Sequence, residues 1–263
     1  MKTPVFGIQL YTLRDYIQTA EDFDSTLARL AKMGIHDVQI SAIGDIPAEI
    51  QRDILNKYSM KVCITHKPID RMKNDLDNLL HEHEIIGCHD IGIGCAPSDA
   101  RDNSGSVRAF IKDLNAIGEN MAKRGFHLYY HNHAFEFYRL ADMNKCMMDL
   151  LLEETNPEYV GFIPDVAWAD YGGQDPVELL EKMEDRVKVI HFKDYMFDEN
   201  SVRRFVPLTK GVVDLKACYD AACRLEIPYI MYEHDDNWPN DDPFEACEIT
   251  VKAIGNLQNK ISN

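Results

Sequence analysis

Three short apolar runs in the second half of the chain each end in a residue that can bind a divalent metal. The runs end at Asp165, His191 and Glu233. Two carboxylates and one imidazole suit Mn²⁺, Mg²⁺, Fe²⁺, Co²⁺ or Zn²⁺ better than a soft metal that prefers thiolates. Each residue alone has an ordinary explanation as a turn cap, a strand-end histidine or an ion-pair partner. Because the three recur at the same end of successive predicted strands, we interpret them as one metal site.

A fourth ligand is expected from the strand that precedes these three runs. There the sequence YYHNHAFEF, residues 129–137, offers His131, His133 and Glu136 within one short stretch. Imidazole and carboxylate groups both bind the metals named above. The residue types alone leave the choice among the three open.

These residues need a fold that brings successive strand ends together. Short runs rich in β-branched and aromatic residues alternate with longer amphipathic segments along the whole chain. The predicted strands are residues 5–10, 36–40, 61–65, 90–93, 127–131, 160–163, 187–192 and 229–233. The predicted helices are residues 23–33, 46–58, 72–86, 107–124, 143–154, 176–183, 215–225 and 244–257. Eight βα units, with no glycine-rich phosphate turn after the first strand, favour a closed (β/α)8 TIM barrel of the α/β class over an open doubly wound sheet.

The length of the chain agrees with this fold. A chain of 263 residues is close to the usual size of one such barrel, so residues 1–263 are predicted to form a single domain. Two longer predicted loops, residues 95–106 and 195–214, both follow strands. We therefore expect both loops on the face that carries the strand ends.

Composition and charge exclude several classes of function. The formal net charge of −16 opposes binding to a phosphate backbone, so nucleic acid is not expected as a partner. No apolar stretch approaches the roughly 20 residues that cross a bilayer, so no membrane partner is expected either. The chain begins without the pattern of a secretory leader, and its seven cysteines lack paired CxxC spacing. We therefore expect a cytoplasmic protein with reduced thiols.

Several segments, taken in their order, give the chain a family resemblance. They are GIQLYTLRD at residues 7–15, YHNHAFEF at 130–137, DVAW at 165–168, HFKD at 191–194, KGVVD at 210–214 and YEHD at 232–235. With these segments the chain resembles the xylose-isomerase-like family of TIM barrels. That family includes sugar and sugar-phosphate isomerases and epimerases, inosose dehydratases and the related endonuclease IV group. The resemblance runs through most of the chain.

The resemblance implies a divalent cation, Mn²⁺ first among the candidates, held by Glu, Asp, His and Glu side chains from strands five to eight. Asp165, His191 and Glu233 match three of these positions. At the fifth-strand position the chain departs from the commoner pattern, because an acid is expected near His131 and the nearest acid is Glu136. Either Glu136 reaches back to the metal or His131 takes its place, and we prefer Glu136.

The family's isomerases place two carboxylates beside the substrate, one to remove a proton next to a carbonyl and the other to return it. The resemblance therefore implies catalytic roles for Glu233, as the base, and for Glu136. Lys193 follows the seventh-strand metal ligand by two residues and should point to the same side of its strand. We expect Lys193 either to bind substrate oxygens and stabilise an oxyanion, or to form a surface ion pair with Asp194 or Asp235.

Other polar and aromatic residues near the strand ends are candidates for contacts with substrate. They are His66, His131, His133, Trp168, Gln9 and Tyr11, with Phe135 and Trp238 as further aromatic walls. Sugar rings have apolar C–H faces that pack on aromatic side chains, although core packing is the alternative for each aromatic residue. Arg203, Arg204 and Lys210 could bind a phosphate or form a solvated loop surface, and we expect an unphosphorylated substrate.

Together these features predict a divalent-metal-dependent isomerase or epimerase that acts on a keto-sugar or polyol ketone. An inosose-type dehydratase or a 3-keto-glycoside lyase would begin with the same proton abstraction. An abasic-site endonuclease would need further ligands and a basic surface, and a non-catalytic polyol-binding barrel would lack the fifth-strand ligand. A small sugar or polyol is the expected partner, and long loops at the mouth of the barrel are compatible with a homodimer.

Overall fold

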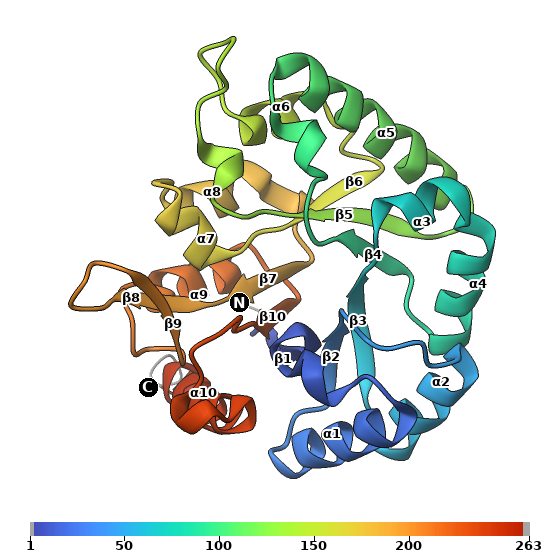
Figure 1. Ribbon diagram of the computed structural model, residues 1–263, viewed down its shortest axis with the longest axis vertical. Coiled ribbons are helices and arrows are strands. Elements are labelled where there is room, and N and C mark those ends of the chain that lie inside the picture. The colour runs from blue at the N-terminus through green and yellow to red at the C-terminus, as the bar shows by residue number, and fades with distance from the viewer. Residues whose placement is uncertain (1–2, 260–263) are drawn as a thin grey trace.

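A computed structural model describes residues 3–259, which form a parallel β-barrel surrounded by helices (Figure 1). Residues 1–2 and 260–263, which the sequence analysis assigns to the same domain, lie outside the described residues. The barrel strands are β1 (Val5–Gln9), β2 (Asp37–Ile40), β3 (Lys61–His66), β4 (Asp90–Ile93), β5 (His127–His131), β6 (Val160–Ile163), β7 (Val189–Phe192) and β10 (Tyr229–Tyr232). They lie in the order β6-β5-β4-β3-β2-β1-β10-β7, and two bridges, Phe162 to Val187 and Asp165 to His191, join β6 to β7. The prediction of a (β/α)8 barrel is therefore confirmed.

Helices follow the strands and cover the outside of the barrel (Figure 1). They are α1 (Ala20–Lys32), α2 (Ala48–Lys57), α3 (Ile69–Asn74), α4 (Leu76–Ile86), α5 (Ser104–Ala122), α6 (Met147–Glu154), α7 (Val166–Tyr171), α8 (Pro176–Met183), α9 (Leu215–Arg224) and α10 (Pro243–Asn259). Short 3₁₀ helices are η1 (Leu10–Tyr16), η2 (Ser98–Arg101), η3 (Phe135–Phe137), η4 (Glu184–Arg186) and η5 (Pro239–Asp241). In α1 the Thr19 side chain caps the N-terminus, and Phe23, Leu27 and Leu30 recur on one buried face.

The hydrophobic core has two parts. The larger part packs strands against helices, as the buried residues of α1 do. The smaller part is made of strand residues: Cys63, Ile64, Ile163, Val189, Tyr229 and Met231. Because these come from β3, β6, β7 and β10, they meet inside the barrel. This packed interior fixes the strand ends from which side chains project at the C-terminal mouth.

The structure differs from the predicted elements mainly in the loops. All eight predicted strands are present; three have the predicted bounds, and the other five differ by one or two residues at one end. The segment after β7 was predicted to be a loop, but it contains an antiparallel hairpin of β8 (Asp194–Phe197) and β9 (Arg203–Val206). In this hairpin Tyr195 pairs with Phe205 and both are buried, whereas Met196 and Phe197 are exposed. So short an alternation gives too weak a sequence signal to be recognised. No helix in residues 3–259 has the length and apolar character needed to cross a membrane.

Candidate metal centre

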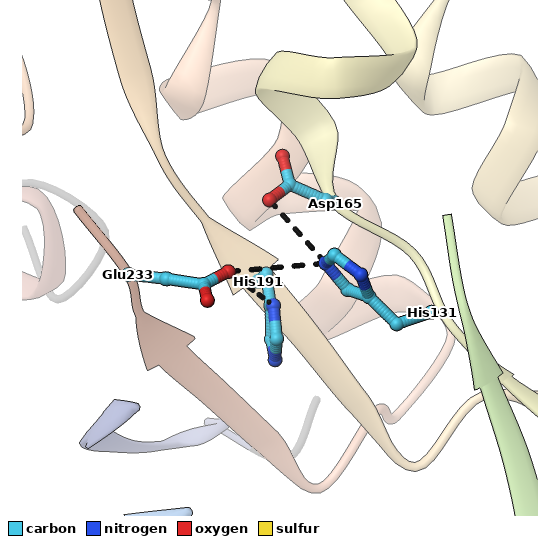
Figure 2. Close-up of side chains that lie close together, drawn as sticks. All are labelled: His131, Asp165, His191 and Glu233. Atoms are coloured by element: carbon cyan, nitrogen blue, oxygen red, sulfur yellow. Dashed lines mark hydrogen bonds and ion pairs between the residues drawn. The ribbon is translucent and has the colours of Figure 1, made fainter. Parts of the chain in front are cut away.

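Four side chains from neighbouring strands converge at the C-terminal mouth of the barrel (Figure 2). His131 ends β5, Asp165 follows β6, His191 lies in β7 and Glu233 follows β10. All four are buried, and one ligand atom from each lies within 4.8 Å of the other three. The structure thus brings together the three residues that the apolar runs singled out, and it adds His131 as the fourth.

The orientation of His131 is set by a backbone carbonyl. Its Nδ1 lies 3.0 Å from the carbonyl oxygen of Gly94, which can only accept, so Nδ1 carries the proton. Its Nε2 then faces Asp165 Oδ2 at 3.6 Å and Glu233 Oε2 at 3.8 Å. Within residues 3–259 neither His131 Nε2 nor Asp165 Oδ2 has a hydrogen-bond partner. A lone pair directed at two carboxylates is stabilised when a cation, either a proton or a metal, lies between them.

His191 is held from both sides of its ring. Its Nδ1 lies 2.9 Å from Glu233 Oε2, and its Nε2 lies 2.8 Å from Oε1 of Gln39, the side chain of a buried residue in β2. A proton on Nε2 satisfies the amide oxygen and leaves the Nδ1 lone pair facing the site. Partners of this kind orient histidine ligands in metalloproteins. Gln39 was not among the candidates from the sequence.

The charges around Lys193 leave the site negative. Lys193 is buried, and its Nζ lies 3.2 Å from Asp165 Oδ2, 3.1 Å from Glu233 Oε2 and 3.0 Å from Asp235 Oδ2. Three carboxylates therefore face one ammonium, and with neutral imidazoles two negative charges are left. A divalent cation would neutralise them. Lys193 pairs with Asp235, as one of the two alternatives from the sequence had it, but this pair is not on the surface because Lys193 is 1% exposed.

The pKa values in the site are set by burial and by these charges. Burial alone would raise the pKa of Glu233, but Lys193 and His191 hold it well below its usual range. Burial alone would lower the pKa of His131, but Asp165 and Glu233 raise it. Glu233 is therefore ionised and available as a ligand. The raised pKa of His131 means that its Nε2 binds a proton readily, and a metal ion that binds there must displace this proton.

Glu136, the preferred fifth-strand ligand from the sequence, does not join the four converging residues. Its buried carboxylate accepts a hydrogen bond of 2.6 Å from Tyr130 Oη and one of 2.8 Å from the backbone N–H of His133. The 3₁₀ turn η3 directs it to these donors, whereas His131 is the last residue of the strand itself. This geometry favours His131 over Glu136 as the metal ligand.

A cavity of about 590 Å³ lies over the converging side chains. Among the residues that line it are Tyr11, His66, His133, Lys193, Glu233 and Asp235. It extends to Ile43, Pro68 and Arg71 beyond β2 and β3. A volume of this size accommodates a sugar or a larger molecule.

Other candidates from the sequence lie behind or beside the cavity. The Trp168 ring packs 5.4 Å from the His133 ring and 5.4 Å from Lys193 Nζ. The Gln9 side chain contacts the His66 ring at Nδ1. Phe135 stacks on His133, and Trp238 packs near His234.

The three loop cations differ in their surroundings: Arg203 stacks on Phe205, Arg204 pairs with Asp198, and Lys210 is exposed. Arg203, Arg204 and Lys210 are not among the residues that line the described cavity, so a role for these cations in binding a substrate phosphate gains no support.

Two further residues hold the site in place: Asn132, which sequence reasoning missed, and Asp235, which it named only as an ion-pair partner of Lys193. Asn132 Oδ1 accepts a 3.0 Å hydrogen bond from the backbone N–H of Asp165, which ties the ends of β5 and β6 together. Asp235 accepts from Lys193 at 3.0 Å and 3.1 Å. For Asn132, its place next to His131 in the sequence was the one signal available.

Comparisons with known proteins agree with the fold. The sequence matches the family described as xylose isomerase-like TIM barrel over residues 18–246. It is 40% identical over 199 residues to an inosose dehydratase of Geobacillus kaustophilus, covering 66% of this chain and 63% of that protein. A second inosose dehydratase, of Geobacillus thermodenitrificans, is 28% identical over 125 residues, covering 42% of this chain and 41% of that protein. The chain therefore spans less than two thirds of the length of either relative.

Among solved structures, the barrel is similar to a sugar phosphate isomerase/epimerase from Parabacteroides distasonis. The TM-score is 0.80 at 22% sequence identity, covering 96% of this chain and 93% of the other. At this identity the likeness shows a shared fold and no more. The family match covers most of the described residues, and those residues form the expected barrel, so the chain belongs to the xylose isomerase-like TIM barrel family.

Proposed function

We propose that this chain is a metal-dependent enzyme that removes a proton from the carbon beside the carbonyl group of a sugar or polyol ketone. The observation that carries the proposal is the convergence of His131, Asp165, His191 and Glu233 beneath a cavity that also contains Lys193. Two imidazoles and two carboxylates suit Mn²⁺, Fe²⁺, Co²⁺ or Zn²⁺. When bound by these four residues, such a cation would supply Lewis-acid stabilisation of negative charge on substrate oxygen.

The side chains of the site divide the remaining work. Glu233 is ionised and lies at the cavity, so it is our candidate for the base that takes the proton. Lys193 carries a positive charge at the same place, where it can donate a hydrogen bond to the oxygen that becomes negative. Asp235 holds the Lys193 ammonium toward the cavity. The enediolate formed in this step then has one of two fates. It takes a proton back, either at the neighbouring carbon (isomerisation) or at the same carbon from the opposite face (epimerisation), or it expels a β-hydroxyl group, which leaves as hydroxide or water while a C=C bond forms.

Loss of a hydroxyl group, which makes the enzyme a dehydratase, is supported by the relative at 40% identity, an inosose dehydratase. Return of the proton makes it an isomerase when the neighbouring carbon is protonated and an epimerase when the same carbon is protonated from the opposite face; this is the outcome expected from the sequence. Both outcomes share the first step. The substrate is in either case a small polyhydroxylated ketone, and a glycoside with a 3-keto group is included because the cavity extends beyond β2 and β3.

The experiment that tests the shared step is exchange of substrate C–H for deuterium in heavy water. Purified protein, loaded with Mn²⁺, Co²⁺ or Zn²⁺ and checked for bound metal, is incubated with ketoses, an inosose and 3-keto-glucosides, and exchange is followed by NMR and mass spectrometry. Exchange that Glu233→Gln abolishes supports the proposal, even without net turnover. Formation of an unsaturated ketone identifies a dehydratase, and a new sugar isomer identifies an isomerase. If the metal-loaded protein exchanges no proton of any of these substrates, the proposed function is wrong.

Two other functions have less support. Hydrolysis of abasic DNA would need a site for several metal ions, whereas residues 3–259 contain one cluster with ligand geometry, and the net charge is −16. A non-catalytic barrel would be suggested by loss of the acidic fifth-strand ligand; against it stands His131, whose imidazole lies with the other three candidate ligands and can bind the same metals. Incubation with an abasic duplex tests the first alternative, and the exchange experiment tests the second.

A further inference from the structure

His66, the last residue of β3, lies beside the proposed metal ligands without being one of them. Its ring centroid is 5.3 Å from that of His131 and 5.5 Å from that of His191, and it lines the cavity. Its Nε2 is buried and has no hydrogen-bond partner among the described residues. A buried polar nitrogen next to a cavity needs an explanation, because such atoms are normally paired.

The proton position on His66 follows from its contact with Gln9. Gln9 Oε1 accepts a 3.1 Å hydrogen bond from the backbone N–H of Tyr11, and a backbone N–H can only donate. This fixes the side-chain amide, so the Gln9 NH₂ group is the one that lies 3.4 Å from His66 Nδ1. An amide NH₂ also only donates, so His66 Nδ1 must accept. The ring of His66 therefore carries its proton on Nε2.

His66 and His131 are thus adjacent imidazoles of opposite polarity. In His131 the proton lies on Nδ1, bound to the carbonyl of Gly94, and the Nε2 lone pair faces Asp165 and Glu233. In His66 the lone pair on Nδ1 is used by Gln9, and the Nε2–H is the unpartnered group. The first arrangement suits a ligand of a cation, and the second suits a donor to an oxygen atom.

We infer that His66 donates a hydrogen bond from Nε2–H to the substrate's carbonyl oxygen, and that Gln9 is the residue that fixes this donor. The inference rests on the proposed function and deepens it by adding a catalytic residue and a positioning residue. As the substrate C–H bond breaks, its electrons form the new C=C bond and the carbonyl oxygen gains negative charge. The His66 N–H faces that oxygen and strengthens its bond as the charge grows. The proton stays on His66, so no further reactant is needed.

The inference changes the role that the sequence suggested for Gln9. Gln9 is fully buried, and both ends of its amide are engaged by Tyr11 and His66. It does not line the described cavity, so it acts on the substrate through His66. Gln9 is paired in register with Gln39 of β2, which also contacts a histidine but with its Oε1, 2.8 Å from His191 Nε2. This pairing provides a matched control.

The first measurement reads the proton position directly, without turnover. Histidine labelled with ¹⁵N is followed by long-range ¹H–¹⁵N NMR in protein loaded with diamagnetic Zn²⁺, and His66→Gln assigns the signal. We expect the Nε2–H form of His66 in the unchanged protein and the Nδ1–H form in Gln9→Glu, because a carboxylate at this place accepts a hydrogen bond from Nδ1–H. Gln39→Glu should leave the His66 signals as they are. An Nδ1–H form in the unchanged protein would overturn the inference.

The second measurement tests the donor during the reaction. In His66→Leu we expect C–H exchange to slow about 100-fold, with Zn²⁺ affinity close to that of the unchanged protein. His66→Gln can still donate a hydrogen bond and should recover part of the loss. A loss of Zn²⁺ affinity in His66→Leu that matches the loss of rate, or no loss of rate, would contradict the inference. If the unchanged protein exchanges no proton, the proposed function fails, whereas the NMR result still decides the role of Gln9.

Discussion

The two ends of the barrel treat buried charge differently. At the N-terminal end Lys188 pairs with Asp90, and Lys61 donates to Tyr229 Oη at 2.5 Å. At the C-terminal mouth one buried ammonium, that of Lys193, faces three carboxylates. At the N-terminal end, called the lower end below, the buried carboxylate of Asp90 thus has a cation of its own, whereas the mouth keeps an excess of negative charge. An excess of buried negative charge lowers the stability of the fold unless a cation binds there. The charges at the mouth are therefore explained by function, and those at the lower end by stability.

The histidines show the same difference between the mouth and the helices that surround the barrel, which we call the shell. In the shell, His83 of α4 is satisfied at both nitrogens, by Thr65 Oγ1 at 2.8 Å and by the carbonyl of Leu79 at 2.7 Å. At the mouth, His66, His131 and His133 each have one buried nitrogen without a partner among the described residues. A satisfied histidine contributes to packing. A histidine with one open nitrogen is available to a ligand.

The largest effect is expected from removing the charge of Glu233, because this residue is both a proposed ligand and the proposed base. Glu233→Gln should lower C–H exchange by about 10³-fold or more, within or beyond the range for loss of a general base. It should also lower the metal content of the purified protein, measured by elemental analysis. The comparison of the two ends further implies that the metal-free variant unfolds no earlier than the metal-free parent, because the change reduces the charge excess at the mouth. A metal content equal to that of the parent would show that Glu233 is not a ligand.

A change at the lower end should have the opposite pattern. Lys188→Met leaves the carboxylate of Asp90 without its cation, and Asp90 is 6% exposed. We expect the free energy of unfolding to fall by about 1–3 kcal/mol, the cost of a buried polar group that loses its partner. Metal affinity and C–H exchange should stay as in the parent. Urea unfolding measures the free energy of unfolding, calorimetric titration measures metal affinity, and NMR measures C–H exchange.

The control for Lys188→Met is an exposed pair of the same kind. Lys216 and Asp220 lie one turn apart on α9, and both side chains are about half exposed. Lys216→Met should change stability little, because exposed ion pairs contribute little. Equal losses in the two variants would mean that the Lys188–Asp90 pair contributes no more than a surface pair, so that the two ends of the barrel do not differ in how they stabilise buried charge.

A smaller effect on the mouth is expected from Gln39, which contacts His191 from outside the ligand set. Gln39→Met keeps the length of the side chain and removes the acceptor of His191 Nε2. Loss of such a supporting residue typically lowers metal affinity about 10–100-fold. Gln39→Glu retains an acceptor at the same place and should keep the affinity. Titration of the metal-free protein with Zn²⁺ tests both variants, and an unchanged affinity in Gln39→Met would remove Gln39 from the site.

The sequence could predict the barrel but only part of the site, and the reason lies in the range of the interactions. Strand periodicity is local, so it predicts the eight strands and places Asp165, His191 and Glu233 at their ends. The choice between His131 and Glu136 depended on a 3₁₀ turn of three residues, which carries no periodic signal. The contact of Gln39 with His191 joins residues 152 positions apart, across the barrel. Such a contact follows from the closure of the barrel and has no pattern along the chain.

The smallest effect concerns the shell, where the comparison predicts a pH dependence that does not involve the metal. Burial lowers the pKa of His83 from 6.5 to about 4, so the folded protein keeps this ring neutral while the unfolded chain protonates it. The stabilising effect is complete above the unfolded pKa and is lost as the pH falls from about 6.5 toward 4. One proton corresponds to a slope of about 1.4 kcal/mol per pH unit. In metal-free protein, His83→Gln should therefore flatten the dependence of unfolding free energy on pH between about 5 and 6 by nearly one proton. An unchanged slope would mean that His83 is already charged in the fold, and that the shell differs less from the mouth than its hydrogen bonds imply.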